Sequence, residues 1–556
     1  MLEKAGPNAV GRSYGVGDVC SGRSTSTQSK GLNVRKFMPV KDQSLSSKAF
    51  VAIFSIAFLA FLLPASAQTQ GALPTLGDAS DLTISAERRL GDRIIRELYR
   101  DPDYIDDAVL AEYVQSIWQP LVAAARARGE LSPELDERFA WEILLGRDRT
   151  VNAFALPGGY LGLHLGLIGV VETRDELASV LAHELSHVTQ RHISRLLTQQ
   201  SKQTPLLLGA MVLGALAASK NPAATQALVV GGQALAIQNQ LNFSRDMERE
   251  ADRIGYGLMA PAGFAPQGFT GMFDKLQQAN RLNDNGSWPY LRSHPLTTER
   301  MADMQSRVPP GSTPKISGSM PQAFEPGMMA ARARVLGNPG VDVLRQWIAE
   351  PQGTGFASQN AAKRAAALYA SALGSSTLRD SHSARATARK LLDVVKPDPA
   401  AYRLAALLAA EIELAAGDAA AAVAKLPATA AGSGGQSGRP ELLLRAQAFL
   451  RGGAASDAQA VTGALQTWVT THPRDATAWQ LLASAWQASG QPLRAVRAEA
   501  EAQAARYDYA AAVDRFKAGQ DMARRGVSAA DHIEASIIDT RLRAVESLLR
   551  EQASER

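Results

Sequence analysis

The amino-acid sequence predicts an α+β fold that is mostly α, in which a mixed N-terminal domain precedes a solenoid of helices. The first observation is residues 173–188, where apolar residues recur at helical spacing without Gly or Pro. The second is a pair of strand-like runs, 139–145 and 160–165, with the turn sequence Pro-Gly-Gly at 157–159 between them. The third is an Ala-rich helical pattern that continues from residue 326 to the C-terminus.

A chain of 556 residues is long enough for two domains. A stretch rich in Pro, Gly and Ser at 308–321 separates the mixed region from the helical one. We therefore expect an N-terminal extension with a signal peptide at 1–67, a linker at 68–84, the mixed domain at 85–310, a second linker at 311–325 and the helical array at 326–556.

The region before residue 68 has the composition of an export signal. Lys48 precedes an apolar run at 49–63, and Ala65-Ser66-Ala67 follows it. The run is shorter than the roughly 20 residues that span a bilayer, although an uncleaved signal anchor is an alternative. We expect cleavage after Ala67 and a periplasmic location. Residues 1–37 are rich in Gly and Ser, so Met38 is an alternative start to Met1.

The charge distribution argues against a nucleic-acid partner. Residues 1–67 hold eight Lys or Arg and three Asp or Glu, a net charge of +5 that equals that of the whole chain, so the remainder is neutral. The single cysteine, Cys20, also lies in this region. A chain cleaved after Ala67 would need no disulfide, which is compatible with an oxidising compartment.

The most specific motif is H-E-x-x-H at His183–His187. On a helix it places two imidazoles one turn apart on one face, as two ligands of one tetrahedral Zn²⁺ require. Glu184 is then placed to take a proton from a water molecule that the metal activates. Thr173 is a suitable N-cap, with Glu176 three residues later as in a capping box. The alternative is that both histidines are ordinary polar helix residues.

Two histidines leave zinc short of a protein ligand, and a second helical pattern at 244–252 offers carboxylates. Glu248 and Asp252 are four residues apart and share a face. Glu248 could complete a His-His-Glu site, and Asp252 could orient a ligating imidazole. Glu250 and Asp246 compete for these roles, and a solvated charged face is the plain alternative.

Four segments carry a resemblance to a known family: Asn152–Tyr160, His183–His192, Phe243–Gly255 and Ser293–Arg300. In this order they resemble the gluzincin peptidases that include HtpX and the Ste-type CAAX prenyl protease, and most closely the BepA-like (YfgC-like) branch of periplasmic protease-chaperones. The resemblance implies a zincin-type metalloprotease domain at 85–310. It implies one Zn²⁺ per chain on His183, His187 and Glu248, with Glu184 as the catalytic base and Asp252 in support. It also implies that His294 can approach the zinc and hold the enzyme latent.

Three further residues near these motifs have weaker assignments. Asn152 could contact substrate or a developing oxyanion beside an edge strand that pairs with an extended peptide, although a structural hairpin is the alternative. His192 lies five residues past His187, off the ligand face, and is not expected to be a ligand. His164 lies in an expected strand and is structural or at the substrate edge.

Outside the motifs, two regions suggest partners. Two short apolar pieces within 206–236 could form a buried helical pair, or lie against a membrane or an unfolded client. Their shortness favours a soluble or peripheral hairpin, although HtpX spans the membrane in the corresponding part. Residues 472–507 match one tetratricopeptide unit, and 402–422 is a weaker copy. Such TPR-like helix pairs stack into a binding surface. The resemblance implies unfolded or misassembled envelope proteins as clients, and the β-barrel assembly machinery as a partner.

Together these features predict a zinc-dependent endopeptidase that hydrolyses peptide bonds of misfolded or stalled envelope proteins in periplasmic quality control of outer-membrane β-barrel assembly. One alternative is a mainly non-proteolytic chaperone or scaffold whose zinc site is latent under His294. A second is a membrane-integrated protease like HtpX.

Overall fold

The computed structural model describes residues 82–200, 244–281, 288–307, 323–427, 438–452, 458–525 and 531–554. The chain divides into two units, residues 1–77 and 78–556, and every described residue belongs to the second. The expected signal peptide, the apolar stretch 206–236 and the stretch 308–321 lie outside the described residues. Within the described part, no helix combines the length and the apolar character needed to cross a bilayer.

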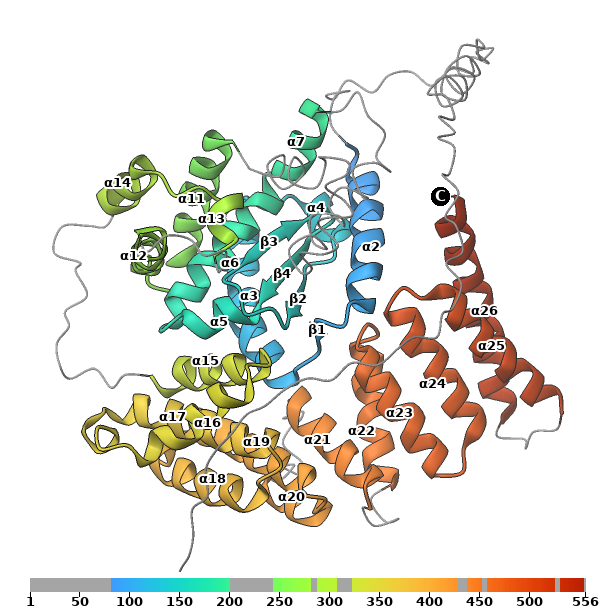
Figure 1. The fold of residues 1–556 in the computed structure, drawn as a ribbon. Coiled ribbons are helices and arrows are strands. Elements are labelled where there is room, and N and C mark those ends of the chain that lie inside the picture. The colour runs from blue at the N-terminus through green and yellow to red at the C-terminus, as the bar shows by residue number, and fades with distance from the viewer. Residues whose placement is uncertain are drawn as a thin grey trace, which may run out of the picture. The chain divides into compact units, whose positions relative to one another are not determined.

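Helices surround a small sheet in residues 82–307 (Figure 1), which confirms a mostly helical α+β fold. The strands are β1 (Tyr104–Ile105), β2 (Glu142–Gly146), β3 (Ala153–Leu156) and β4 (Tyr160–His164). The helices are α2 (Ile84–Arg100), α3 (Ala108–Ala127), α4 (Pro133–Arg138), α5 (Leu165–Val170), α6 (Arg174–Thr189), α7 (His192–Gln200), α11 (Arg245–Met259), α12 (Gln267–Arg281), α13 (Tyr290–Ser293) and α14 (Thr298–Arg307).

The sheet has the order β1-β2-β4-β3, so β3 forms one edge of it. β2 and β4 pair in parallel, whereas β3 and β4 form an antiparallel hairpin. The expected turn at 157–159 is present, but it joins β3 to β4 and not the two predicted strands. Glycine is required at Gly159, which has a φ of 85° and where a Cβ atom would lie 2.7 Å from the Cβ of Phe139.

The predicted strand boundaries were partly wrong. Strand β2 begins later than residue 139, because Phe139 ends α4 and Trp141 has a φ of 52°, which bends the chain before pairing begins. Leu165 was expected in a strand and instead begins α5. The register of β4 against β2 and β3 leaves all five of its residues buried in the centre of the sheet.

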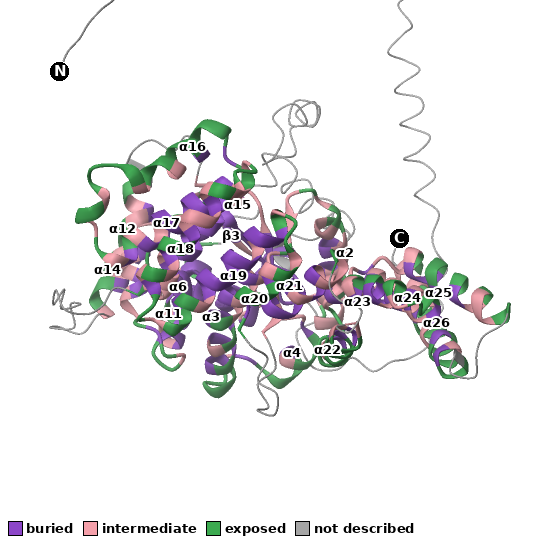
Figure 2. Ribbon diagram, turned by 90° about the horizontal axis from the view of Figure 1, so that it is seen from below, coloured by how far each residue is buried: buried purple, intermediate pink, exposed green. Residues whose placement is uncertain are grey.

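The central helix is α6, which packs against α3, α11, α12 and β3. The five apolar residues that the spacing placed in the core are all at most 3% exposed: Leu177, Val180, Leu181, Leu185 and Val188. Thr173 caps the helix as predicted, because its Oγ1 accepts a hydrogen bond from the Glu176 amide at 3.1 Å. The reciprocal half of the capping box is absent, since Glu176 accepts from the Glu172 amide at 2.7 Å. Figure 2 shows α6 as buried.

Beyond residue 323 the described chain is helical throughout (Figure 1). Its elements are α15 (Phe324–Leu336), α16 (Val341–Ala349), η1 (Glu350–Gln352), η2 (Phe356–Ser358), α17 (Ala361–Thr377), α18 (Ser381–Val395), α19 (Pro399–Ala415), α20 (Ala419–Lys425), α21 (Arg439–Leu450), α22 (Ala458–Thr471), α23 (Ala476–Ala488), α24 (Pro492–Ala505), α25 (Tyr509–Arg524) and α26 (Asp531–Ser554). The pairs α19–α20 and α23–α24 coincide with the two segments that the repeat pattern singled out. Their identity as tetratricopeptide units stays a prediction.

Three arginines, which we call the arginine series, join these helices to the start of α3. Each guanidinium holds one carboxylate of residues 106–112 and a second carboxylate further along the array, on α19, on α21 or at the N-cap of α23, at 2.5–3.1 Å. The sets are Arg332 with Asp107 and Glu411, Arg403 with Glu112 and Glu441, and Arg439 with Asp106 and Asp475. Paired, bidentate contacts of this kind fix direction as well as distance.

Candidate metal centre

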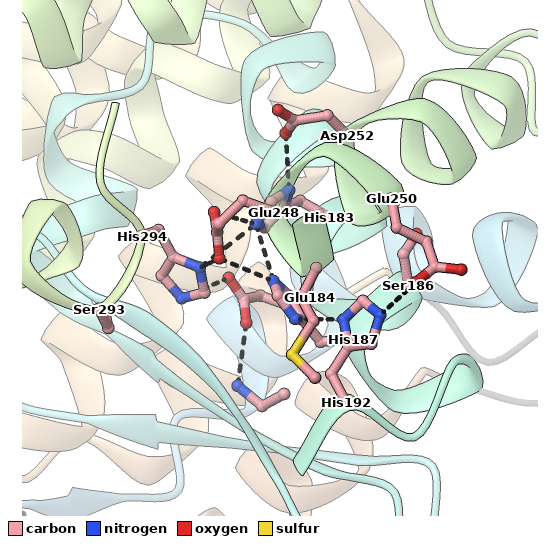
Figure 3. A network of polar contacts seen from close by, with 12 residues as sticks. His183, Glu184, Ser186, His187, His192, Glu248, Glu250, Asp252, Ser293 and His294 are labelled. Carbon is pink, nitrogen blue, oxygen red and sulfur yellow. Dashed lines mark hydrogen bonds and ion pairs between the residues drawn. The ribbon is translucent and has the colours of Figure 1, made fainter. Parts of the chain in front are cut away.

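Three separate parts of the chain bring the predicted zinc residues together (Figure 3). Helix α6 carries His183 and His187 one turn apart, and α11 packs on α6 with Glu248 facing them. His294, the residue that ends α13, completes the cluster. These four residues are at most 2% exposed.

The distances between the ligand atoms are close to those of a zinc site. Ligands about 2.0–2.1 Å from a tetrahedral Zn²⁺ lie about 3.3 Å from one another. The Nε2 atom of His183 lies 3.0 Å from Nε2 of His187, 3.4 Å from Oε2 of Glu248 and 3.3 Å from Nδ1 of His294. The Oε1 atom of Glu248 lies 3.4 Å from Nε2 of His187 and 3.0 Å from Nδ1 of His294. One ligand atom from each of the four residues lies within 4.8 Å of all the others, so the residues fit a single zinc ion.

Glu184 lies beside this cluster and is fully buried. Its Oε2 accepts a hydrogen bond from the backbone amide of Ala155 in the edge strand β3, at 2.9 Å. Its Oε1 accepts no hydrogen bond from the described residues and lies 3.4 Å from Nε2 of His294. One oxygen is thus fixed by the strand, and the other faces the side on which a reacting water would lie.

Behind His183, a buried ion pair fixes the orientation of the ring. Its Nδ1 lies 2.9 Å from Asp252, and Arg300 binds both Asp252 oxygens at 2.6 and 2.8 Å. Burial acts to raise the pKa of Asp252, but the charge and hydrogen bonds of Arg300 lower it. Burial also acts to lower the pKa of His183, yet its hydrogen bonds with Asp252 and Glu248 raise it to about 9. Arg300 extends to Glu248 as well, at 2.7 Å.

Behind His187 the partner is a second histidine. Nδ1 of His192 lies 2.8 Å from Nδ1 of His187, and Nε2 of His192 lies 3.0 Å from Glu250. Burial lowers the pKa of His192 to about 4, so the ring is neutral at neutral pH. Burial likewise holds the pKa of His187 well below its usual value. The two cluster imidazoles on α6 are therefore held from behind, His183 by a carboxylate and His187 by a ring.

The competing carboxylates of α11 lie in different surroundings. Glu248 and Asp252 are each 1% exposed and point at the histidines. The side chain of Asp246 is 84% exposed and pairs with Arg249, while Glu250 lies behind His192. The geometry therefore brings Glu248 to the cluster and leaves its competitors outside.

The remaining predicted residues lie near the cluster but do not join it. His192 is not among the ligand atoms, as expected, but its contact with His187 was not anticipated. His164 ends β4, is buried, and lies 2.9 Å from Thr150 Oγ1 through Nδ1. Asn152 precedes β3, and its Oδ1 is buried without a hydrogen-bond partner in the described part of the chain.

The sequence analysis assigned no role to Arg300 and excluded His192 only as a zinc ligand, without predicting its contact with His187. Arg300 belongs to a segment that the resemblance had singled out, and a lone basic residue after Ser-His-Pro could have been tested as a partner for two carboxylates. His192 gave no such signal, because spacing on a continuous helix directs it away from His187.

The chain matches the model of peptidase family M48 over residues 110–308. The beta-barrel assembly-enhancing protease of Escherichia coli K12 is 31% identical over 460 residues, which cover 80% of this chain and 87% of that protein. The chain belongs to peptidase family M48. The mitochondrial metalloendopeptidase OMA1 of Saccharomyces cerevisiae is 28% identical over 201 residues, 35% of this chain and 55% of that protein.

A further relative aligns over less than half of the chain. A Vibrio cholerae protein whose name also describes a beta-barrel assembly-enhancing protease is 38% identical over 253 residues, 44% of this chain and 49% of that protein. The chain thus covers about half the length of that relative. Family membership and the buried His-His-Glu-His cluster identify a zinc metalloendopeptidase with one Zn²⁺ as its cofactor.

Proposed function

We propose that this M48 peptidase is exported and hydrolyses extended segments of misfolded or stalled envelope proteins during outer-membrane β-barrel assembly. The observation that carries the proposal is a buried cluster of four ligand atoms, all within 4.8 Å of one another, beside a carboxylate that the edge strand holds. The shared name of the relatives in Escherichia coli and Yersinia pestis, beta-barrel assembly-enhancing protease, supports the biological setting.

The proposed chemistry divides between metal and side chains. His183, His187 and Glu248 hold the zinc, which when bound lowers the pKa of a water molecule and polarises a peptide carbonyl. Glu184 accepts the water proton and delivers it to the leaving amine. The bond from the Ala155 amide keeps the carboxylate aimed at this task. Asp252 acts through His183, whose ring it orients.

The edge strand is the proposed substrate platform. Hydrogen bonds alternate in direction along an antiparallel strand, and the Asn152 carbonyl accepts from the His164 amide of β4. The backbone groups of Ala153 and Ala155 therefore point away from β4, toward Glu184 and the edge at which no further described strand pairs. An extended peptide can pair there, with its scissile bond beside Glu184. Asn152, at the start of this strand, contacts the substrate or the developing oxyanion in this proposal.

His294 gives the proposal a resting state. A catalytic zinc site keeps a position open, whereas a site with four protein ligands is closed. Nδ1 of His294 occupies the fourth corner, 3.0 Å from Glu248, and its ring stacks on Tyr290. This arrangement supports a latent peptidase that opens when His294 leaves. It also favours the second candidate, a mainly non-proteolytic chaperone or scaffold with a permanently latent site.

The remaining assignments of the proposal concern organisation. Residues 85–310 form the peptidase domain, and 326–556 form a TPR-like domain that recognises misassembled clients and the β-barrel assembly machinery. Cleavage after Ala67 releases the chain into the periplasm. Residues 206–236 contact the membrane peripherally in this proposal. A membrane-extraction assay tests this, because a chain integrated in the membrane like HtpX would resist extraction.

The test measures zinc content and cleavage of casein, an unfolded substrate, by four forms of the full chain: wild type, Glu184→Gln, His294→Ala and Glu137→Gln. Loss of general-base catalysis should slow cleavage by Glu184→Gln about 100- to 10,000-fold while zinc is retained. His294→Ala should cleave faster than the wild type. Glu137, an exposed residue of α4, is the matched control and should change neither quantity.

Two results would decide against the proposal. Undiminished cleavage by zinc-loaded Glu184→Gln would remove Glu184 from the mechanism. Absence of cleavage in both the wild type and His294→Ala, with zinc bound, would favour the non-proteolytic candidate.

A further inference from the structure

The turn that follows α6 is held in a conformation that needs support. Arg191 has a φ of 52°, in the left-handed region, which is unfavourable for a residue other than glycine. Its guanidinium offsets this cost through an ion pair with the buried Glu87 at 3.0 Å and a hydrogen bond to Ser194 Oγ at 3.0 Å. A third bond reaches the carbonyl of Leu82. A glycine would adopt this φ freely but could make none of these contacts, so the turn is anchored to α2.

This turn decides where His192 lies. On a continuous helix a residue five positions after His187 is rotated by about 140° from it. Because α6 ends at Thr189 and the chain reverses at Arg191, His192 instead returns to the back of His187, 2.8 Å away between the two Nδ1 atoms. Both rings are 0% exposed. Figure 3 shows the resulting row from the ligand cluster through His187 and His192 to Glu250.

We propose that His192 is a positioning residue for the zinc ligand His187. The inference rests on the proposed function, in which Nε2 of His187 binds the metal. Nδ1 of His187 then carries the proton and donates it to Nδ1 of His192. His192 consequently carries its own proton on Nε2 and donates it to the Glu250 carboxylate, which Arg195 holds at 3.0 Å. One arrangement of protons satisfies every polar atom of the row.

The two histidine ligands consequently differ in their support. His183 is backed directly by the carboxylate of Asp252, which strengthens its ring as an electron donor. His187 is backed by an uncharged imidazole, with the carboxylate of Glu250 one ring further away. His192 therefore fixes the tautomer and the direction of His187 without placing a second negative charge against it.

The test is the zinc dissociation constant of the full chain, measured by competition with a chromophoric chelator. His192→Phe keeps a ring of similar size but removes both hydrogen bonds, and loss of such a partner weakens metal binding about 10- to 100-fold. Glu250→Ala, at a side chain that is 30% exposed, should weaken it several-fold by freeing the outer end of His192. His164→Phe is the matched control, a second buried histidine whose Nδ1 faces Thr150, and should stay within twofold of wild type.

Zinc affinity within twofold of wild type for both His192→Phe and Glu250→Ala would overturn the inference, as would an equal loss in His164→Phe. If His192→Phe does not fold, Glu250→Ala decides alone. The absorption spectrum of the cobalt-substituted protein adds a second readout, because a shifted His187 changes the ligand field. A reference variant, His187→Phe, distinguishes failure of the proposed function from failure of this inference. If it binds zinc as tightly as wild type, His187 is not a zinc ligand and the proposed function fails.

Discussion

Replacing Arg332 with methionine should destabilise the protein strongly although the residue lies outside the metal centre. The side chain is 5% exposed and binds Asp107 and Glu411 through four contacts of 2.7–2.8 Å, besides the Tyr369 hydroxyl at 3.0 Å. Methionine keeps the volume but leaves two carboxylates without a cation, a defect that costs about 3–5 kcal/mol. Because the side chain of Glu411 is 23% exposed and can gain water, we expect about 3 kcal/mol.

A loss of that size should lower the midpoint temperature of thermal unfolding by roughly 4 °C, because the unit of residues 78–556 is large. The assay is unfolding followed by circular dichroism at 222 nm and pH 7. Arg345→Met is the matched control, because that side chain is 70% exposed and its ion pair with Asp342 is 3.4 Å long. We expect less than about 0.5 kcal/mol from it. Neutralising the stranded acids as well, with Asp107→Asn and Glu411→Gln, should recover part of the loss. Equal midpoints for Arg332→Met and Arg345→Met would refute the reasoning.

Three further outcomes follow from the contacts. Ala155→Pro removes the backbone amide that donates to Glu184 but removes no hydrogen bond to β4. Cleavage should therefore slow roughly 10- to 100-fold while zinc is retained. An unchanged rate of cleavage would contradict this. Burial acts to raise the pKa of Asp475, but the hydrogen bonds and charge of Arg439 lower it. The ion pair therefore stabilises the protein at pH values above the unfolded-state pKa of about 3.9, and this stabilisation is lost as the pH falls further. Acid denaturation of Asp475→Asn should consequently depend less on pH than that of the wild type, and acid-denaturation curves of equal slope would contradict this. Removing zinc with a chelator should abolish cleavage. It should also lower the free energy of unfolding by about 2.7 kcal/mol if the free zinc concentration had been 100 times Kd. The loss should be smaller in Glu248→Gln, and thermal unfolding of both proteins with and without the chelator measures the difference.

The parts of the site that the sequence could predict are those set within one element. Helical spacing placed His183, Glu184 and His187 correctly because α6 is regular and begins at a good N-cap, Thr173. The same rule put Glu248 and Asp252 on one face of α11. It could not choose between Glu248 and Glu250, because that choice depends on which side of α11 packs on α6.

The parts that could not be predicted depend on a break in an element or on contacts between distant residues. The position of His192 follows from a left-handed Arg191, a conformation that local sequence disfavours and that Glu87, 104 residues earlier, stabilises. Strand β3 is four residues long, too short for alternation to distinguish it from a turn. The capping box was misread because Glu176 bonds one residue further back than the pattern specifies.

The arginine series also joins parts of the chain that are far apart in the sequence. The three arginines follow their partners at the start of α3 by 225, 291 and 333 residues. Each set of ion pairs therefore closes a loop of at least 225 residues, and contacts between residues so distant in sequence slow folding. A chain truncated before Arg332 would leave Asp106, Asp107 and Glu112 without these cations.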